Sequence, residues 1–367
     1  MKILVVQDWL RSGGTERQAI LLTREFALAG HASSLLTFRP GGRLSAGLAG
    51  VASRSLQPFD THLDWFAPCL ARTVRDTAPD VLLCMGKTAN AYAGGLQATA
   101  RKAGLATVVI GTLRSGYALP WYYVRSIRRV RHVVANSQDA ARFFAGQYGF
   151  APERMTVIHN SLVFPEVAPV RDENLRAQWG AKPTTTVLLS VAMFRPEKGQ
   201  SELISTVAGL PASLNWQLWL AGDGPARPAC ERLAASLGLG NRIRFLGFHS
   251  NPAPLYAAAD IAVHASREEA LSNFLIEAQA HGLPAVACEA LGIDECFLPG
   301  RTGWKVPHGA PEIFRSAVLR LASAPTNERT ERAAEARSFA RENFDPSRQV
   351  AAYLDLFRNL QATAPAP

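Results

Sequence analysis

Two glutamates in the second half of the chain, Glu269 and Glu277, are the strongest candidates for functional residues, and they lie eight positions apart. They lie in the segment SREEALSNFLIEAQAHGLP, where a helix is predicted to begin at Ser272. The backbone N–H groups of Leu271, Ser272 and Asn273 would then point out of the helix N-terminus, which favours an anion. Carboxylates beside such an anion accept hydrogen bonds from sugar hydroxyls. Surface glutamates are the alternative interpretation.

Two cations follow a predicted strand in the same half of the chain. The strand TTTVLLSVA leads into MFRPEKGQ, which places Arg195 and Lys198 in a loop just before a helix. A lysine point charge and an arginine fork at the carboxyl end of a strand suit a diphosphate. A solvated loop is the alternative.

A glycine pair follows the first predicted strand. In LRSGGTERQAILL, Gly13 and Gly14 allow backbone N–H groups to approach a ligand, and Thr15 with Gln18 forms a capping-box pattern that opens a helix. The segment lacks the Lys-Ser/Thr of a P-loop and the third glycine of a dinucleotide fingerprint. A plain tight turn is the other interpretation.

A basic and aromatic cluster lies in RSGYALPWYYVRSIRRVRH. It contains Arg114 and, near one face of a predicted helix, Trp121, Arg125, Arg128 and Arg129. This pattern suits an anionic membrane surface or a lipid-linked phosphate. A solvated cationic helix would produce the same pattern.

These residues must be positioned by alternating strands and helices. Strands are predicted in the first half at 3–7, 34–38, 81–85, 107–110, 132–135 and 156–159, and in the second half at 187–192, 217–221, 243–246, 261–264 and 285–288. Helical patterns follow many of them, and two amphipathic helices are predicted at 327–341 and 348–360. FPEVAPVR, at 164–171, is predicted to be a linker.

This alternation predicts an α/β protein with two doubly wound, mostly parallel sheets. We expect an N-terminal Rossmann-like domain at 1–165, a C-terminal one at 171–342 and a final helix at 343–360. In such sheets, ligands bind beyond the carboxyl ends of the strands, so the strand-to-helix loops should carry the chemistry, with a ligand in a cleft between two facing domains.

Composition limits the function classes. The 367 residues are 48% hydrophobic and 19% charged, which is typical of a folded globular chain. No apolar stretch reaches the ~18 residues of a spanning helix, and the N-terminus lacks a signal-peptide pattern. Five scattered cysteines favour a reducing cytoplasm over disulfides or zinc, and the eight histidines show no metal-ligand spacing.

The net positive charge of the chain comes from its first half. Residues 1–170 hold 19 of the 39 basic and 10 of the 30 acidic residues, so the remainder carries 20 of each. The net charge of +9 therefore favours an anionic partner for the first half. No nucleic-acid-binding module is visible, so nucleic acid is not an expected partner.

Taken in order, these loops resemble the retaining glycosyltransferases of the GT-B fold, specifically glycosyltransferase family 4 (glycosyl transferases group 1). The resemblance spans nearly the whole chain and is densest after residue 156. Its motifs are GGTE at 13–16, VIHNSLV at 157–163, PEKG at 196–199, LAGDGP at 220–225, IRFLGF at 243–248, LYAAADIAVHAS at 255–266, EALSNFLIEAQAHGLPAVA at 269–287 and GRTGWKVP at 300–307.

The resemblance implies specific roles. Glu269 and Glu277 match the family's E-x7-E pair, so the first would contact the donor sugar and the second the nucleotide ribose. Lys198 matches the cation on the donor diphosphate, and Gly14 matches the glycine that lies against the diphosphate and the transferred sugar. The family needs no divalent metal, so neither metal nor cofactor is expected. The final helix is similar to the family helix that crosses back to the first domain.

Several positions depart from the family pattern. Met193 stands where the family usually has an arginine, with Arg195 two residues later, so either Arg195 reaches the phosphate by a different path or that contact is lost. Ala270 replaces the glycine after the first glutamate, and Leu291 replaces the first of a glycine pair. Many members also have a first-domain histidine in a stretch where this chain offers Arg114, a candidate for an acceptor phosphate.

The expected activity is metal-independent, retaining transfer of a hexosyl unit from a nucleotide sugar, UDP-sugar favoured, to a glycan or lipid-linked acceptor. The resemblance implies lipopolysaccharide, capsule or exopolysaccharide synthesis by a cytoplasmic enzyme, peripheral on the inner face of the membrane. A non-catalytic nucleotide-binding scaffold and a sugar-nucleotide epimerase are the alternatives. A nicotinamide oxidoreductase is disfavoured because neither half carries GxGxxG after its first strand.

Overall fold

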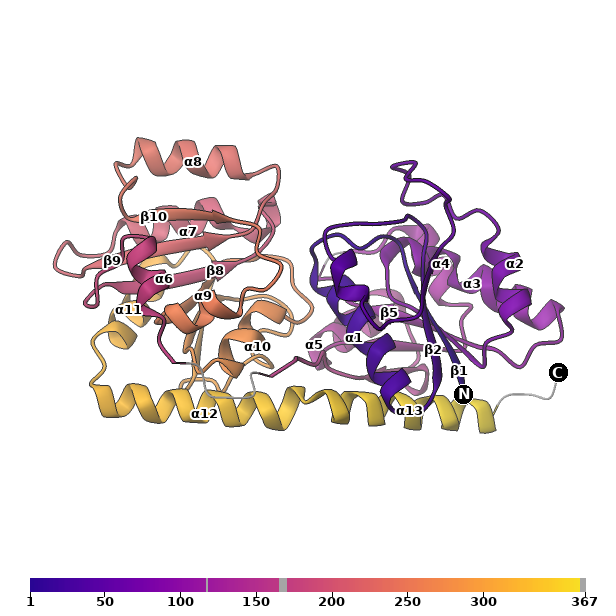
Figure 1. Cartoon of the computed structure of the whole chain (residues 1–367). Helices are drawn as coiled ribbons and strands as arrows, with labels where there is room; N and C mark the ends of the chain where they lie inside the picture. Colours follow the sequence, from indigo (N-terminus) through magenta and orange to yellow (C-terminus); the bar gives the residue numbers. More distant parts are fainter. Residues whose placement is uncertain (117, 165–169, 364–367) are drawn as a thin grey trace. The chain divides into compact units, whose positions relative to one another are not determined.

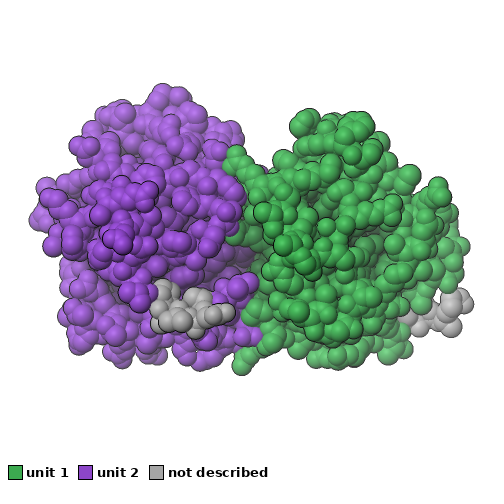
Figure 2. All heavy atoms as spheres, viewed as in Figure 1, with its two compact units in different colours: residues 1–161, 346–367 green, residues 162–345 purple. Residues whose placement is uncertain are grey.

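The computed structural model describes residues 1–116, 118–164 and 170–363. The chain divides into two compact units, Met1–Ser161 with the final helix from Pro346, and Leu162–Asp345 (Figure 2). Part of the predicted linker at 164–171 lies outside the described residues. The prediction of two parallel sheets covered by helices is confirmed for the described part of the chain.

Unit 1 is built on a parallel sheet. Across its described residues the sheet has seven strands in the order β3-β2-β1-β4-β5-β6-β7. Figure 1 labels β1, β2 and β5 of this sheet. The strands are β1 (Lys2–Gln7), β2 (Ala32–Thr37), β3 (Ser53–Ser55), β4 (Val81–Cys84), β5 (Val108–Leu113), β6 (His132–Ala135) and β7 (Met155–Val157). The helices are α1 (Gly14–Leu28), α2 (Leu70–Thr77), α3 (Lys87–Lys102), α4 (Trp121–Ile127), α5 (Gln138–Tyr148) and α13 (Pro346–Ala362).

The last helix, α13, packs within unit 1 although it is far from α1 in sequence. Its Tyr353 and Phe357 rings lie 6.0 Å and 5.6 Å from the ring of Phe26 on α1. The Gln349 side chain donates to the His159 carbonyl at 2.7 Å and accepts from Ser161 Oγ at 2.6 Å. These apolar and polar contacts hold α13 to the first unit.

Unit 2 repeats the architecture. Within residues 170–345 the sheet has six parallel strands in the order β10-β9-β8-β11-β12-β13. The strands are β8 (Thr186–Val191), β9 (Trp216–Ala221), β10 (Ile243–Gly247), β11 (Ile261–His264), β12 (Ala285–Cys288) and β13 (Gly303–Val306). The helices are α6 (Glu173–Gln178), α7 (Gln200–Ala208), α8 (Arg227–Ser236), α9 (Ala253–Ala258), α10 (Asn273–Ala280), α11 (Pro311–Ala322) and α12 (Thr326–Phe344).

The core of unit 2 lies on both faces of its sheet. Along β8, Val187 and Leu189 face one buried apolar cluster and Leu188 faces the other, as the period of two along a strand requires. Helices α10 and α12 cover the first cluster, and α7 and α11 cover the second. The middle of β8 is therefore apolar on both faces, and the polar residues Arg195 and Lys198 lie in the loop after it.

Two strands differ from the sequence analysis. β3 has the sequence SRS and β13 has GWKV, and neither was predicted. Both are short edge strands without a β-branched run, so nothing in their composition separates them from loops. They are strands because they pair with β2 and β12.

Candidate functional site

The carboxyl ends of β8 and β11 bring Lys198 and Glu269 together in unit 2. After β8 the chain forms a short 3₁₀ turn, Pro196–Lys198, that ends at Gly199 with φ +67°. A Cβ at Gly199 would lie 2.2 Å from the Ala265 carbonyl oxygen, so glycine allows the Lys198 loop to pack against the loop after β11. The Lys198 Nζ then donates to Glu269 Oε1 at 2.7 Å.

Glu269 receives a second hydrogen bond from a buried histidine. His264, the last residue of β11, lies with its Nε2 3.0 Å from the same Oε1 atom. Burial alone would raise the pKa of Glu269, but the charge of Lys198 and the hydrogen bond from His264 outweigh it and lower the pKa to about 2. The Glu269 side chain is therefore an ionised carboxylate at neutral pH, and 12% of it is exposed.

Helix α10 begins at the predicted residue, directly after this ion pair. Ser272 is its N-cap, and the Ser272 Oγ accepts from the Leu275 N–H at 3.4 Å. The Ser272 Oγ also lies 3.4 Å from the His264 Nε2 that contacts Glu269, so the N-terminus of α10, with Leu271 and Asn273 beside the cap, is linked to the ion pair through His264. The helix dipole and the Lys198 charge favour an anionic ligand at the same end of the sheet.

Glu277 lies one turn into α10 and is also held by a buried side chain. The Tyr256 hydroxyl, from α9, donates to Glu277 Oε2 at 2.5 Å. The Tyr256 ring stacks on His281 with centroids 4.8 Å apart, and its residue is 1% exposed. The second glutamate of the predicted pair therefore has a fixed position.

Sequence reasoning missed His264 and Tyr256. The sequence predicts no role for His264; the side chain is buried, and its Nε2 is directed at Glu269. The signal was its place at the carboxyl end of a predicted strand, five residues before Glu269. Tyr256 gave no comparable signal, because only the packing of α9 against α10 places its hydroxyl at Glu277.

The structure does not bring Arg195 into this constellation. The Arg195 side chain is 43% exposed and lies 3.9 Å from Glu197, and the Met193 carbonyl accepts from the Gln200 side chain. Of the other two departures from the family pattern, Ala270 is buried and Leu291 is half-buried. The phosphate contact of Arg195 therefore remains a prediction.

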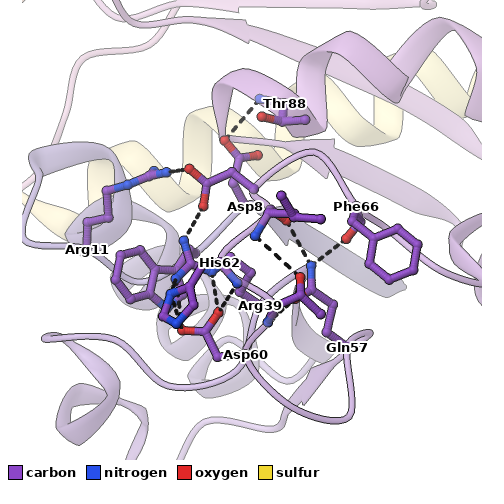
Figure 3. A network of polar contacts seen from close by, with 12 residues as sticks. Asp8, Arg11, Arg39, Gln57, Asp60, His62, Phe66 and Thr88 are labelled. Carbon is purple, nitrogen blue, oxygen red and sulfur yellow. Dashed lines mark hydrogen bonds and ion pairs between the residues drawn. The ribbon is translucent and has the colours of Figure 1, made fainter.

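In unit 1, the loop between β1 and α1 is held by a network of charges (Figure 3). Asp8 accepts from the N–H groups of Thr88 and Ala89 at 3.0 and 2.7 Å, at the start of α3. Burial raises the pKa of Asp8, and those two hydrogen bonds oppose the rise. The guanidinium of Arg39 lies 3.8 Å from the Trp9 ring centroid.

The same network reaches the glycine pair. Arg39 forms ion pairs with Asp60 at 2.7 Å and Asp64 at 2.6 Å, and Arg11 bridges Asp64 and Glu16. Gly13 is the N-cap of α1 and provides no side-chain cap, and a Cβ there would lie 2.5 Å from Glu16 Oε2. The backbone of Gly13 and Gly14 is thus presented by a rigidly held loop.

The basic cluster of unit 1 is arranged differently from the predicted helical face. Helix α4 ends at Ile127, so Arg128 is its C-cap and Arg129 lies beyond it. A prediction that all four residues share one helical face is therefore wrong, because the chain turns toward β6 after only seven helical residues. All four side chains are exposed, and Arg128 also donates to the Tyr148 carbonyl at 2.5 Å.

Arg114 is separate from these surface cations. It follows β5, and its Nη2 donates to the Asn160 side chain. Burial lowers its pKa, and Nη1 is enclosed without a hydrogen-bond partner among the described residues. The acceptor-phosphate contact of Arg114 stays a prediction.

The part of the chain that the structure describes has neither a metal-ligand cluster nor a membrane-spanning helix. No group of three or more His, Cys, Asp or Glu side chains in that part of the chain is placed to hold a metal ion. No helix there is long and apolar enough to cross a membrane. All five cysteines are described as free thiols, with Cys69 exposed and the others buried.

Comparison with known proteins points to one enzyme class. A family model described as Glycosyltransferase Family 4 matches residues 12–162, and one described as Glycosyl transferases group 1 matches residues 185–324. The chain is 34% identical over 146 residues to the lipopolysaccharide core biosynthesis glycosyltransferase LpsE of Rhizobium meliloti, covering 40% of this chain and 42% of LpsE. It is 30% identical over 236 residues to the D-inositol 3-phosphate glycosyltransferase of Rhodococcus erythropolis, covering 62% and 53%.

The chain thus spans about half the length of these two curated relatives. Solved structures match over almost the whole chain. Anabaena HepE in complex with UDP-glucose is 24% identical with a TM-score of 0.81, covering 98% of this chain and 100% of HepE. WaaG, a glycosyltransferase involved in lipopolysaccharide biosynthesis, is 19% identical with a TM-score of 0.75, covering 97% and 99%. These matches confirm the GT-B fold class.

Proposed function

Because the chain belongs to the glycosyltransferases, with a family 4 domain followed by a group 1 domain, we propose that it transfers a hexosyl unit from a nucleotide sugar to an acceptor hydroxyl. The transfer retains the anomeric configuration and uses no metal ion. The observation that carries the proposal is the ion pair of Lys198 and Glu269 beside the N-terminus of α10, with Glu277 one turn into that helix.

In this proposal the donor diphosphate lies against Lys198 and the first turn of α10. Lysine has three N–H donors, of which two are directed at Glu269 Oε1 and the Glu268 carbonyl, so one is left for a phosphate oxygen. Glu269 accepts hydrogen bonds from the sugar hydroxyls, and Glu277 accepts a hydrogen bond from the ribose.

The chemical step is a front-face displacement. The bond between the anomeric carbon and the diphosphate oxygen breaks, a bond to the acceptor oxygen forms on the same face, and the acceptor proton passes to the leaving phosphate. No protein base is then needed, and the chain contributes positioning and stabilisation of the leaving charge.

We propose a UDP-sugar as the donor and a glycan or lipid-linked acceptor of cell-surface polysaccharide as the second substrate. HepE has been solved with UDP and with UDP-glucose, which supports the uracil base. LpsE acts in lipopolysaccharide core biosynthesis, which supports the acceptor class.

Product analysis tests this function and its metal independence. Incubation with UDP-sugars and core oligosaccharide acceptors should release UDP and form an α-linked product, identified by its anomeric proton in NMR spectra. Excess EDTA should leave the rate unchanged. A β-linked product or loss of activity in EDTA contradicts the proposed mechanism.

The same assay separates the two alternatives. A sugar-nucleotide epimerase would interconvert nucleotide sugars without an acceptor. A non-catalytic scaffold would bind the nucleotide and release no product.

We further propose that unit 1 associates with the anionic inner face of a membrane. Trp121 is 74% exposed beside the exposed Arg125. Trp65 is 61% exposed, and its carbonyl accepts from Tyr92 on α3, the helix that packs on α4. Exposed tryptophans beside arginines suit the interface of an anionic bilayer, and five unpaired cysteines support a cytoplasmic location.

Vesicle sedimentation tests this association. Vesicles of phosphatidylcholine with phosphatidylglycerol should bind the chain, and W121S with R125E should weaken the binding severalfold. The matched control is L28S, an equally exposed apolar residue on α1. Binding that is insensitive to salt and to anionic lipid removes the membrane proposal.

A further inference from the structure

Two buried side chains in unit 2 each hold one of the glutamates assigned to the donor. His264 contacts Glu269, and Tyr256 contacts Glu277. Neither side chain is within the segment 269–277 that carries the glutamate pair. Each glutamate therefore owes its position to a different element, β11 for the first and α9 for the second.

His264 fixes which oxygen of Glu269 faces outward. Its Nε2 and the Lys198 Nζ both bond to Oε1, at 3.0 and 2.7 Å. Oε2 has no hydrogen bond to any residue that the structure describes. The His264 ring is 3% exposed and lies 5.7 Å from the Phe274 ring, so it has little freedom to follow the carboxylate if Glu269 moves. Oε2 is left to accept from a ligand hydroxyl.

Tyr256 performs the corresponding role for Glu277. Its hydroxyl donates to Oε2 at 2.5 Å, and its ring is confined between Phe274 at 6.0 Å and His281 at 4.8 Å. A hydrogen bond to a charged acceptor is stronger than one between neutral groups. Loss of the hydroxyl would remove this hydrogen bond from the Glu277 carboxylate while the ring still filled its space.

We infer that His264 and Tyr256 are positioning residues that separately set the two halves of donor recognition: His264 the hexosyl half through Glu269, and Tyr256 the nucleoside half through Glu277. The inference rests on the proposed function, because it assigns Glu269 to the sugar and Glu277 to the ribose. It adds that the two halves can be weakened one at a time by separate substitutions.

The test compares the affinity for UDP with the turnover of the UDP-hexose that the wild type consumes fastest. Y256F should weaken UDP binding about 10-fold in calorimetric titration, as expected for one lost hydrogen bond to a charged group. H264L should leave UDP affinity within about 2-fold and lower kcat/KM for the UDP-hexose about 10-fold. H264Q keeps an N–H donor and should recover most of that loss.

Matched controls come from unit 1. Y123F removes a buried hydroxyl that donates to the Thr112 carbonyl, and H132L removes a buried imidazole that contacts Thr156. Both should leave UDP affinity and turnover unchanged. The two controls measure how much the loss of one buried polar contact, by itself, changes UDP affinity and turnover. Thermal unfolding of all variants identifies any that fold poorly.

The outcomes are distinguishable. Equal effects of Y256F and H264L on UDP affinity and on turnover, or no effect of either, overturn the inference while the proposed function stands. A wild-type chain that binds no nucleoside diphosphate and consumes no nucleotide sugar overturns the proposed function, and the inference with it.

Discussion

Replacing Lys198 by alanine is expected to lower kcat about 10²- to 10³-fold, because this is the typical cost of removing one preorganised group that stabilises a developing charge. Lys198 is held in place by Glu269 and by the close approach of Gly199 to the next loop. The Lys198 ammonium is therefore already in place, and its side chain does not have to move when the diphosphate leaves. Steady-state kinetics with the preferred nucleotide sugar measure the effect.

Arg195 supplies the control from the same loop. Its side chain is 43% exposed and does not contact the Lys198–Glu269 pair. R195A should therefore change kcat less than about 3-fold, because an exposed cation is screened by water and salt. Unchanged kcat/KM in K198A, or equal losses in K198A and R195A, would remove the role assigned to Lys198.

K198A also has an expected pH signature. The folded-state pKa of Glu269 is about 2, below its usual value of 4.5. The stabilisation that accompanies this lowering is present above pH 4.5 and is lost as the pH falls toward 2. K198A should thus be less stable than the wild type at pH 7, and the difference in unfolding free energy should shrink below pH 4.5. Denaturant unfolding at several pH values measures it.

The second large effect is expected at Glu277. E277Q keeps the size of the side chain but replaces the charged carboxylate that would accept a hydrogen bond from the ribose hydroxyl. Hydrogen bonds to charged groups contribute about 1.5–3 kcal/mol each. UDP affinity should therefore fall about 10- to 100-fold in calorimetric titration. E269Q is the matched comparison: Glu269 reaches the diphosphate only through Lys198, so E269Q should weaken UDP affinity less than E277Q does. Equal weakening by both variants would contradict the division of roles.

The sequence was sufficient to predict the elements that carry this site. Repeated β-branched runs predicted β8 and β11, and the serine of SREEALSNF predicted the start of α10. Each of these signals is local: a run of apolar, β-branched residues predicts a strand, and an N-cap residue predicts the start of a helix. The position of Lys198 near Glu269 follows from the order of parallel strands, since β8 and β11 are neighbours.

What could not be predicted depends on packing between distant segments. Tyr256 reaches Glu277 across 21 residues, and Arg39 reaches Asp60 across 21 residues with the Trp9 ring beneath it. No periodicity encodes such pairs. The end of α4 at Ile127 has the same origin, because RSIRRV is compatible with a longer helix and the chain turns there to enter β6.

The measurement that tests the central claim most directly is the thermal unfolding of the wild-type chain with UDP, GDP, ADP, dTDP, CMP or NAD. A nucleoside diphosphate at 100 times its Kd should stabilise the fold by about 2.7 kcal/mol, which gives a clear rise in Tm. The account predicts this rise with UDP and its absence with NAD. No shift with any nucleoside diphosphate, or a shift with NAD alone, would contradict a nucleotide-sugar site in this protein.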